Sequence, residues 1–131
     1  MTDKKTHKES KGHVLIVEDN ELNLKLFRDL LLSHGYKVTE TKEGSEAIHL
    51  VKQTSPALII MDIQLRGISG FEVIQQIKSE QSIKDIPIVA VTAFAMKDDR
   101  DRILESGCEA YVPKPISIGP FLEVVEKYIK T

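Results

Sequence analysis

The sequence has a single cysteine, no tryptophan and no long hydrophobic run. Cys108 cannot form an internal disulfide, which is typical of a protein kept in a reducing cytoplasm. The longest apolar stretch, Ala57 to Ile63, is interrupted by Asp62 and is far shorter than the roughly 20 residues that a helix needs to cross a bilayer. Residues 1–12 are polar and lack the apolar core of a secretory signal. These absences predict a cytoplasmic protein without a membrane span.

The sequence also lacks a strong charge of one sign. Its formal net charge is −2, and because residues 1–12 carry a net +2, the rest of the chain carries −4. Binding to nucleic acid needs clustered lysine and arginine, so this mildly acidic body predicts no nucleic-acid partner. A length of 131 residues with 41% hydrophobic and 29% charged residues is typical of one globular domain. We therefore predict a disordered leader over residues 1–12 and one domain over residues 13–131.

Short apolar runs alternate with longer amphipathic stretches five times along the chain. Three continuous apolar runs, 14–17, 58–61 and 88–91, are typical of parallel strands that are covered by helices on both faces. Residues 37–40 alternate in polarity as an edge strand does, and residues 110–112 form a fifth, shorter candidate.

Helical patterns lie between these strands. Asn20 is a good N-cap for the first helix, which carries a stripe of leucines, and Gly35 is a good signal for its end. Right-handed crossovers between parallel strands give an α/β, flavodoxin-like, doubly wound sheet with strand order 2-1-3-4-5 and five helices. The other four helices are expected at about 45–53, from residue 69, at 97–106 and from residue 118 to 129.

In such a sheet, ligands bind at the carboxyl ends of the strands. The residues that follow the predicted strands there are Glu18, Asp19, Asp62, Thr92 and Lys114. Two carboxylates about 4 Å apart repel each other by roughly 4 kcal/mol at an effective dielectric constant near 20, so three of them need a cation. Oxygen ligands without a cysteine–histidine cluster favour Mg²⁺ over zinc. Helix capping is an alternative for Glu18 and Asp19, but it leaves Asp62 unexplained.

Asp62 interrupts an apolar strand, where an unpaired buried charge is costly. A carboxylate in that place can act as a covalent nucleophile toward a phosphoryl group and form an aspartyl phosphate. A metal ion and the Lys114 ammonium would balance the charge of the phosphoryl oxygens, and the Thr92 hydroxyl would contact one of them. The pattern therefore predicts phosphoryl transfer to Asp62.

Four segments carry a family resemblance. Residues 14–20, 61–64, 91–93 and 114–116 resemble the signatures of bacterial response-regulator receiver domains of the CheY-like type, and the similarity spans residues 13–130. Further stretches, including residues 17–26, 89–97 and 107–111, resemble the DivK group of single-domain receivers, which acts in cell-cycle and cell-division control.

The resemblance implies a role for each residue of the acidic cluster. Asp62 would accept a phosphoryl group from a phosphohistidine on a histidine kinase or histidine phosphotransfer protein. Mg²⁺ would be held by Glu18, Asp19, Asp62 and the backbone carbonyl of Gln64. Phosphoryl transfer and dephosphorylation would be self-catalysed, so the chain would be a signalling domain and not an enzyme that turns over a substrate.

The resemblance also implies how the signal leaves the site. Thr92 and Lys114 would contact the phosphoryl group, and Tyr111 would rotate inward after Thr92; without the resemblance, Tyr111 reads as an ordinary aromatic residue near the sheet edge. Lys114–Pro115 would be a cis peptide. Because no effector domain follows residue 131, output is expected through protein contacts of the fourth helix, the fifth strand and the fifth helix.

Two departures from the family pattern affect the neighbourhood of the site. Arg66 and Gly67 stand where many family members have a proline, which predicts a more mobile loop after Asp62. Pro113 precedes Lys114 where a residue with a backbone N–H is usual, which predicts the loss of one hydrogen bond.

Two other functions fit parts of the pattern. Mg²⁺-dependent phosphatases of the haloacid dehalogenase type also place a nucleophilic aspartate after a strand, but they usually carry a second acid two residues later, where this sequence has Gln64. They also carry a cap domain, for which this chain has no room. A receiver-like module that binds partners without being phosphorylated would be expected to have lost Asp62, Thr92 or Lys114, and all three are present.

Overall fold

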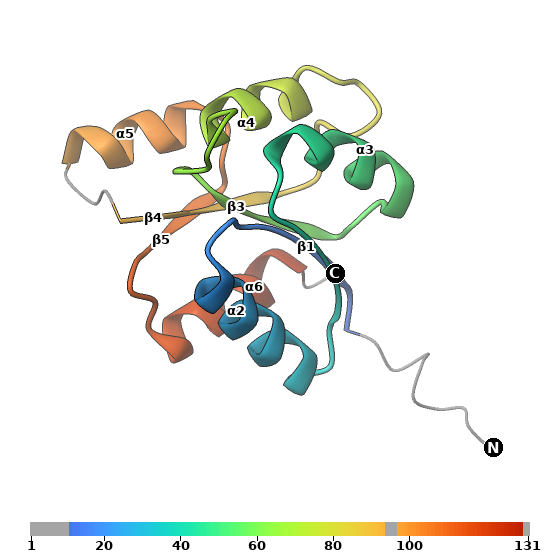
Figure 1. The fold of residues 1–131 in the computed structure, drawn as a ribbon, viewed down its shortest axis with the longest axis vertical. Coiled ribbons are helices and arrows are strands. Elements are labelled where there is room, and N and C mark those ends of the chain that lie inside the picture. The colour runs from blue at the N-terminus through green and yellow to red at the C-terminus, as the bar shows by residue number, and fades with distance from the viewer. Residues whose placement is uncertain (1–10, 94–96, 130–131) are drawn as a thin grey trace.

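The computed structural model describes residues 11–93 and 97–129, so most of the predicted leader lies outside the described residues. In the described part, five strands and five helices alternate along the chain (Figure 1). The strands are β1 (His13–Val17), β2 (Lys37–Thr41), β3 (Leu58–Asp62), β4 (Ile88–Thr92) and β5 (Ala110–Pro113). The helices are α2 (Glu21–Ser33), α3 (Gly44–Thr54), α4 (Gly70–Lys78), α5 (Lys97–Glu105) and α6 (Ile118–Ile129).

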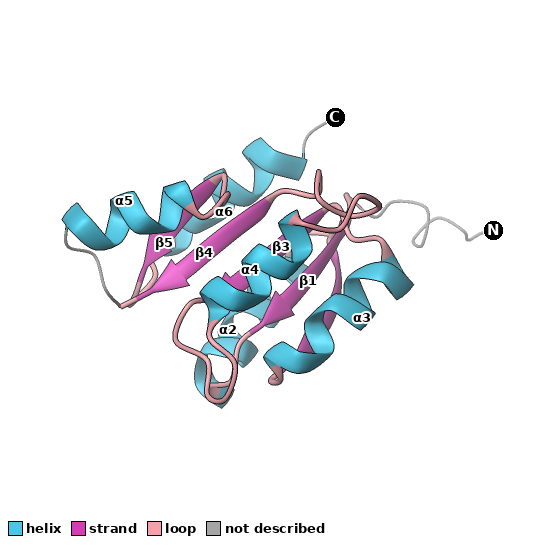
Figure 2. Ribbon diagram, turned by 90° about the horizontal axis from the view of Figure 1, so that it is seen from above, coloured by secondary structure: helices cyan, strands magenta, loops and turns pink. Residues whose placement is uncertain are grey.

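The strands form one parallel sheet in the order β2-β1-β3-β4-β5, which confirms the predicted fold (Figure 2). Helices α3, α4 and α5 cover one face of the sheet, and α2 and α6 cover the other (Figure 1). All strands point the same way, so their carboxyl ends share one edge of the sheet. The polar residues predicted to form the site lie at the strand ends and in the loops of this edge.

Each face of the sheet has its own apolar core. In β1, Val14 and Ile16 pack toward α2 and α6, whereas Leu15 and Val17 pack toward α3, α4 and α5. Burial on both faces explains why β1, β3 and β4 are apolar without alternation. The ring of Phe121 in α6 stacks on that of Phe27 in α2 with centroids 5.2 Å apart, and it joins these two helices under the sheet.

Strands β3 and β4 extend one residue further than their apolar runs predict. Asp62 and Thr92 are therefore the last residues of their strands, and Asp62 pairs with Val91 in the sheet register. The hydrogen-bonded ladder includes both polar residues because backbone pairing does not depend on side-chain polarity. The sheet thus fixes the direction of the Asp62 side chain.

The predicted N-cap of α2 is confirmed. Asn20 Oδ1 accepts a hydrogen bond from Asn23 N–H at 3.0 Å, at the start of α2.

Cys108 is buried, and burial raises the pKa of its thiol to about 11. None of the helices in the described ranges is long and apolar enough to span a membrane.

Pro113 lies on the edge strand β5. The backbone N–H of Lys114 donates to Thr92 O at 2.8 Å, so Lys114 faces β4. Because successive residues of a strand direct their N–H groups to opposite sides, the ring nitrogen of Pro113 faces the open edge of the sheet. A proline is tolerated at that position because the sheet needs no donor there.

Candidate functional site

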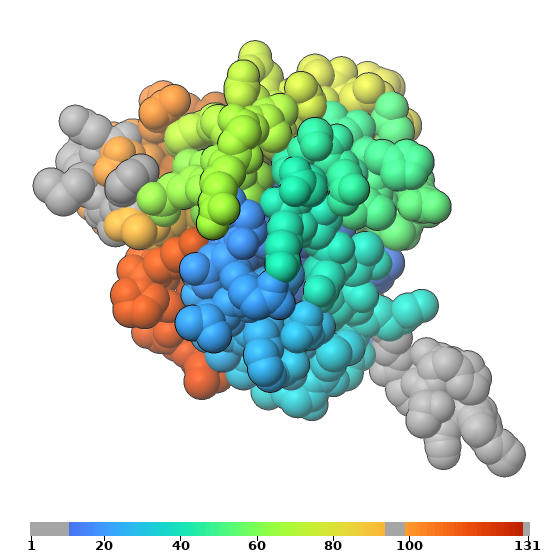
Figure 3. All heavy atoms as spheres, in the orientation of Figure 1, coloured from blue at the N-terminus to red at the C-terminus, as the bar shows by residue number. Residues whose placement is uncertain are grey.

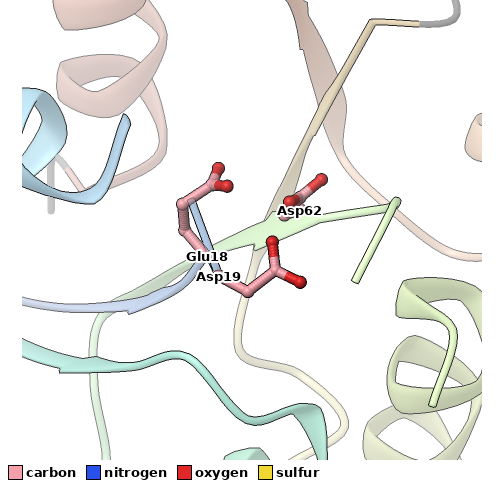
Figure 4. Close-up of side chains that lie close together, drawn as sticks. All are labelled: Glu18, Asp19 and Asp62. Carbon is pink, nitrogen blue, oxygen red and sulfur yellow. The ribbon is translucent and has the colours of Figure 1, made fainter. Parts of the chain in front are cut away.

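Three carboxylates meet at the carboxyl edge of the sheet. Glu18 and Asp19 follow β1, Asp62 ends β3, and their side chains surround one small region (Figure 4). One oxygen atom from each lies within 4.8 Å of the others. The structure therefore brings together the three acids that the sequence places at neighbouring strand ends.

Asp62 is 2% exposed and contacts both a backbone donor and a cation. Its Oδ1 accepts a hydrogen bond from Gln64 N–H at 2.9 Å, and its Oδ2 lies 3.4 Å from Lys114 Nζ. These two contacts hold the carboxylate in one orientation. Asp62 is thus a fixed carboxylate at the end of a buried strand.

Glu18 is buried and incompletely paired. Its Oε2 accepts a hydrogen bond from Asn20 N–H at 3.1 Å, whereas its Oε1 accepts none from the described part of the chain, although Lys114 Nζ lies 3.3 Å away. Burial and the neighbouring carboxyl of Asp62 raise the pKa of Glu18 to about 7, against the opposing effect of Lys114. A buried oxygen without a donor, in an all-oxygen cluster, suits a hard divalent cation.

Lys114 comes from the segment between β5 and α6 and reaches into the acidic cluster. Its ammonium lies 3.3 Å from Glu18 Oε1 and 3.4 Å from Asp62 Oδ2, and its side chain is only 16% exposed. The peptide bond between Lys114 and Pro115 is cis, as the resemblance implies. One lysine therefore offsets part of the charge of two carboxylates.

Thr92 and Tyr111 lie on neighbouring strands on the α5 side of the site. Thr92 is fully buried at the end of β4, and it lines a cavity of about 400 Å³ together with Ile103 of α5. Tyr111 in β5 pairs with Ala90, and its hydroxyl accepts a long hydrogen bond of 3.4 Å from Arg100 of α5. The inward rotation of Tyr111 stays a prediction.

The loop after β3 supplies two contacts that sequence reasoning missed. The backbone N–H of Arg66 donates to Asp19 Oδ2 at 2.9 Å, and the side chain of Gln64 accepts a hydrogen bond from Ala93 N–H at 2.9 Å. A proline at position 66 has no N–H and could not bond to Asp19. The presence of Arg66 in place of the proline of many family members was the one feature of the sequence that could have indicated the bond to Asp19. Figure 3 shows this loop, in yellow-green, against the blue segment that follows β1.

Gly70 allows α4 to begin directly beside the end of β3. A Cβ atom at this position would lie 2.4 Å from the backbone oxygen of Asp62 and 2.7 Å from Ile63 Cα. The Ser69 side chain and Glu72 form a capping box that starts the helix there. Close packing against β3 therefore explains the glycine at position 70.

The fold and this site define a class of protein. Residues 14–126 match the family described as response regulator receiver domain, and the chain belongs to this family. Receivers of two-component systems take phosphoryl groups from kinases or phosphotransfer proteins, so the partners predicted from the sequence agree with the family at this level.

Among curated relatives, the chain is similar to the polar-differentiation response regulator DivK of Brucella ovis. The two are 52% identical over 116 residues, which are 88% of this chain and 94% of the relative. DivK of Brucella anthropi is equally similar, with 52% identity over 116 residues and the same coverage of both chains. The chain is thus a response regulator similar to DivK, and this naming is consistent with the predicted role in cell-cycle control.

Solved receiver structures share the fold. The receiver domain of sensor histidine kinase PA1611 from Pseudomonas aeruginosa has a TM-score of 0.84 and 28% identity, over 92% of this chain and 98% of that one. That protein was crystallised with a magnesium ion coordinated in its active-site cleft. A receiver from Vibrio parahaemolyticus, from a protein described as a LuxO repressor, has a TM-score of 0.83 and 26% identity, over 91% of this chain and 90% of that one.

Proposed function

We propose that the chain is a phosphorylation switch in which Asp62 accepts a phosphoryl group from a phosphohistidine of a partner protein. The observation that supports this proposal is the position of Asp62, buried at the end of β3 between two other carboxylates and the ammonium of Lys114. A purely structural role does not account for three acids gathered around one buried strand end.

The transfer step uses groups of this site. One carboxylate oxygen of Asp62 attacks phosphorus, the P–N bond of the phosphohistidine breaks, and its electron pair stays on the imidazole nitrogen of the donor. The Lys114 ammonium and the Thr92 hydroxyl contact the phosphoryl oxygens. Glu18, Asp19, Asp62 and the backbone carbonyl of Gln64 would hold Mg²⁺, and the bound ion would supply positive charge toward the phosphoryl oxygens.

Output passes through the side of the molecule formed by α5, β5 and α6. Phosphorylation draws the Thr92 hydroxyl toward the phosphoryl group, and Tyr111 turns inward behind it. A partner protein then reads the changed surface, in the control of the cell cycle and cell division. Attack of water on the aspartyl phosphate, within the same site, returns the protein to its first state. The cytoplasm is the compartment in which we place this exchange.

Incubation of the purified chain with acetyl phosphate and Mg²⁺ separates this function from its alternatives. A switch takes up one acid-labile phosphoryl group per chain. A phosphatase of the haloacid dehalogenase type hydrolyses a phosphate ester repeatedly, and a passive binding module does neither. Repeated turnover, or no uptake at all, would contradict the proposal.

Replacing Lys114 with alanine is expected to weaken the response to phosphorylation without unfolding the protein. The change removes the ammonium beside Glu18 and Asp62 but no apolar packing. Loss of a contact to a charged group costs about 1.5–3 kcal/mol, so the concentration of beryllofluoride needed for the NMR response should rise roughly ten- to a hundredfold. Lys52→Ala, which removes an exposed partner of Glu80, is the control. Equal responses of the two variants would count against the role of Lys114.

Magnesium binding is expected to weaken as the pH falls below 7. A proton and a cation compete for the Glu18 carboxylate, whose pKa is raised from 4.5 to about 7. Below that pKa the protonated form dominates, so the dissociation constant for Mg²⁺ should rise about tenfold for each pH unit down to pH 5. Magnesium titrations followed by NMR between pH 5 and 8 measure this slope. Glu18→Gln should bind more weakly and show a flatter dependence, and an equal slope in both proteins would contradict the assignment.

A further inference from the structure

Gln64 makes one hydrogen bond through its backbone and one through its side chain, and these two bonds reach different parts of the site. Its backbone N–H donates to Asp62 Oδ1 at 2.9 Å, and its side-chain Oε1 accepts from Ala93 N–H, also at 2.9 Å. Ala93 directly follows Thr92, the last residue of β4. One residue therefore links the acceptor carboxylate to the start of the connection between β4 and α5.

The contact with Ala93 continues the β3–β4 ladder by one rung. Ile63 N–H donates to Val91 O at 3.1 Å, so Val91 faces β3, and Ala93, two residues later, faces the same way. The backbone of β3 has already turned toward α4 at this point, where Ile63 O accepts a hydrogen bond from Gly70 N–H at 3.2 Å. The carbonyl of Ile63 is therefore not available to Ala93, and the side chain of Gln64 supplies the acceptor in its place.

Both partners of this hydrogen bond can be solvated when it breaks. Gln64 and Ala93 are both exposed, so water can replace either partner. The Gln64 side chain also lines the cavity of about 400 Å³ that Thr92 and Ile103 border under α5. The side chain can thus leave Ala93 without displacing any residue of the buried core.

We propose that Gln64 is a positioning residue that holds Ala93, the residue directly after β4, in its unphosphorylated place and releases it when Asp62 is phosphorylated. This inference rests on the proposed function. Formation of the acyl phosphate removes the negative charge from the Asp62 carboxylate and adds anionic phosphoryl oxygens, which are stronger acceptors for the Gln64 N–H than the neutral acyl oxygen that remains. Gln64 then shifts at its backbone end, and the weaker, neutral bond at its side-chain end breaks.

The test uses Gln64→Met, which keeps the length of the side chain but removes the acceptor. In the unphosphorylated protein, exchange of the Ala93 amide hydrogen with solvent, measured by NMR, should become about threefold faster, as expected for the loss of an exposed hydrogen bond. The amide resonances of residues 99–105 in α5 should move part of the way toward their positions in the wild type with beryllofluoride. Unchanged Ala93 exchange, or unmoved α5 resonances, would overturn the proposal.

Two further variants make the result specific. Gln64→Glu keeps an oxygen at the same reach and should retain the slow exchange of Ala93. Gln76→Met makes the same chemical change at an exposed position of α4 and should alter neither measurement; a shift equal to that of Gln64→Met would overturn the proposal. A wild-type chain that binds no beryllofluoride would contradict the proposed function itself, whereas unchanged Ala93 exchange in a chain that binds it would contradict only the role of Gln64.

Discussion

An Asp62→Asn variant is expected to take up no phosphoryl group from acetyl phosphate and Mg²⁺, under conditions in which the wild type takes up one per chain. The amide has no anionic oxygen that can attack phosphorus, and the two other carboxylates of the cluster, Glu18 and Asp19, are the ones that would hold Mg²⁺. The effect is a complete loss and not a reduced rate. Intact-protein mass spectrometry at neutral pH measures it.

Unfolding is not expected to explain this loss. The asparagine side chain has nearly the shape of the aspartate that it replaces, and the substitution removes a negative charge from beside Glu18 and Asp19. The variant should therefore unfold at no lower a temperature than the wild type without Mg²⁺. Asp85→Asn makes the same change at an exposed site and should keep full uptake. Uptake by Asp62→Asn equal to that of Asp85→Asn would exclude residue 62 as the acceptor.

Phe121→Ala is expected to lower the free energy of unfolding by about 3–5 kcal/mol, the usual cost of deleting a buried aromatic ring. Phe121 is fully buried and stacks on Phe27, so the cavity would open between α6, α2 and the sheet. Domains of this size are stable by only about 5–15 kcal/mol, so the variant should be close to unfolding. Urea unfolding followed by circular dichroism gives the value.

The matched control for this prediction is Phe71→Ala in α4. Phe71 is only partly buried, with Arg102 lying over its ring at 4.1 Å, so its removal should cost less than half as much. Losses of equal size in the two variants would contradict the view that the stacked pair under the sheet anchors α6.

The strand ends could be predicted because two simple patterns agree there. Continuous apolar runs give interior parallel strands, and parallel strands bring their carboxyl ends to one edge. Glu18, Asp62 and Thr92 directly follow such runs, so their meeting was expected before any contact was known. The exact ends of β3 and β4 were missed by one residue, because polar side chains conceal strand residues that the backbone ladder still includes.

The contacts of the loop after β3 could not be predicted in the same way. The bonds of Arg66 N–H to Asp19 and of Ala93 N–H to Gln64 use backbone donors, which every non-proline residue carries. Only the path of the loop decides which acceptor each donor meets. That path depends on the close approach of Gly70 to the backbone of Asp62, a packing detail that residue types alone leave open.

Borohydride reduction of the phosphorylated wild-type chain tests the central claim most directly. An aspartyl phosphate is reduced to homoserine, so peptide mapping reports which side chain carried the phosphoryl group. Homoserine at position 62 is the expected result, and it should vanish when Mg²⁺ is removed by a chelator. Homoserine at position 19 or at any other carboxylate, or a stable phosphoester on Thr92 without homoserine, would contradict the account.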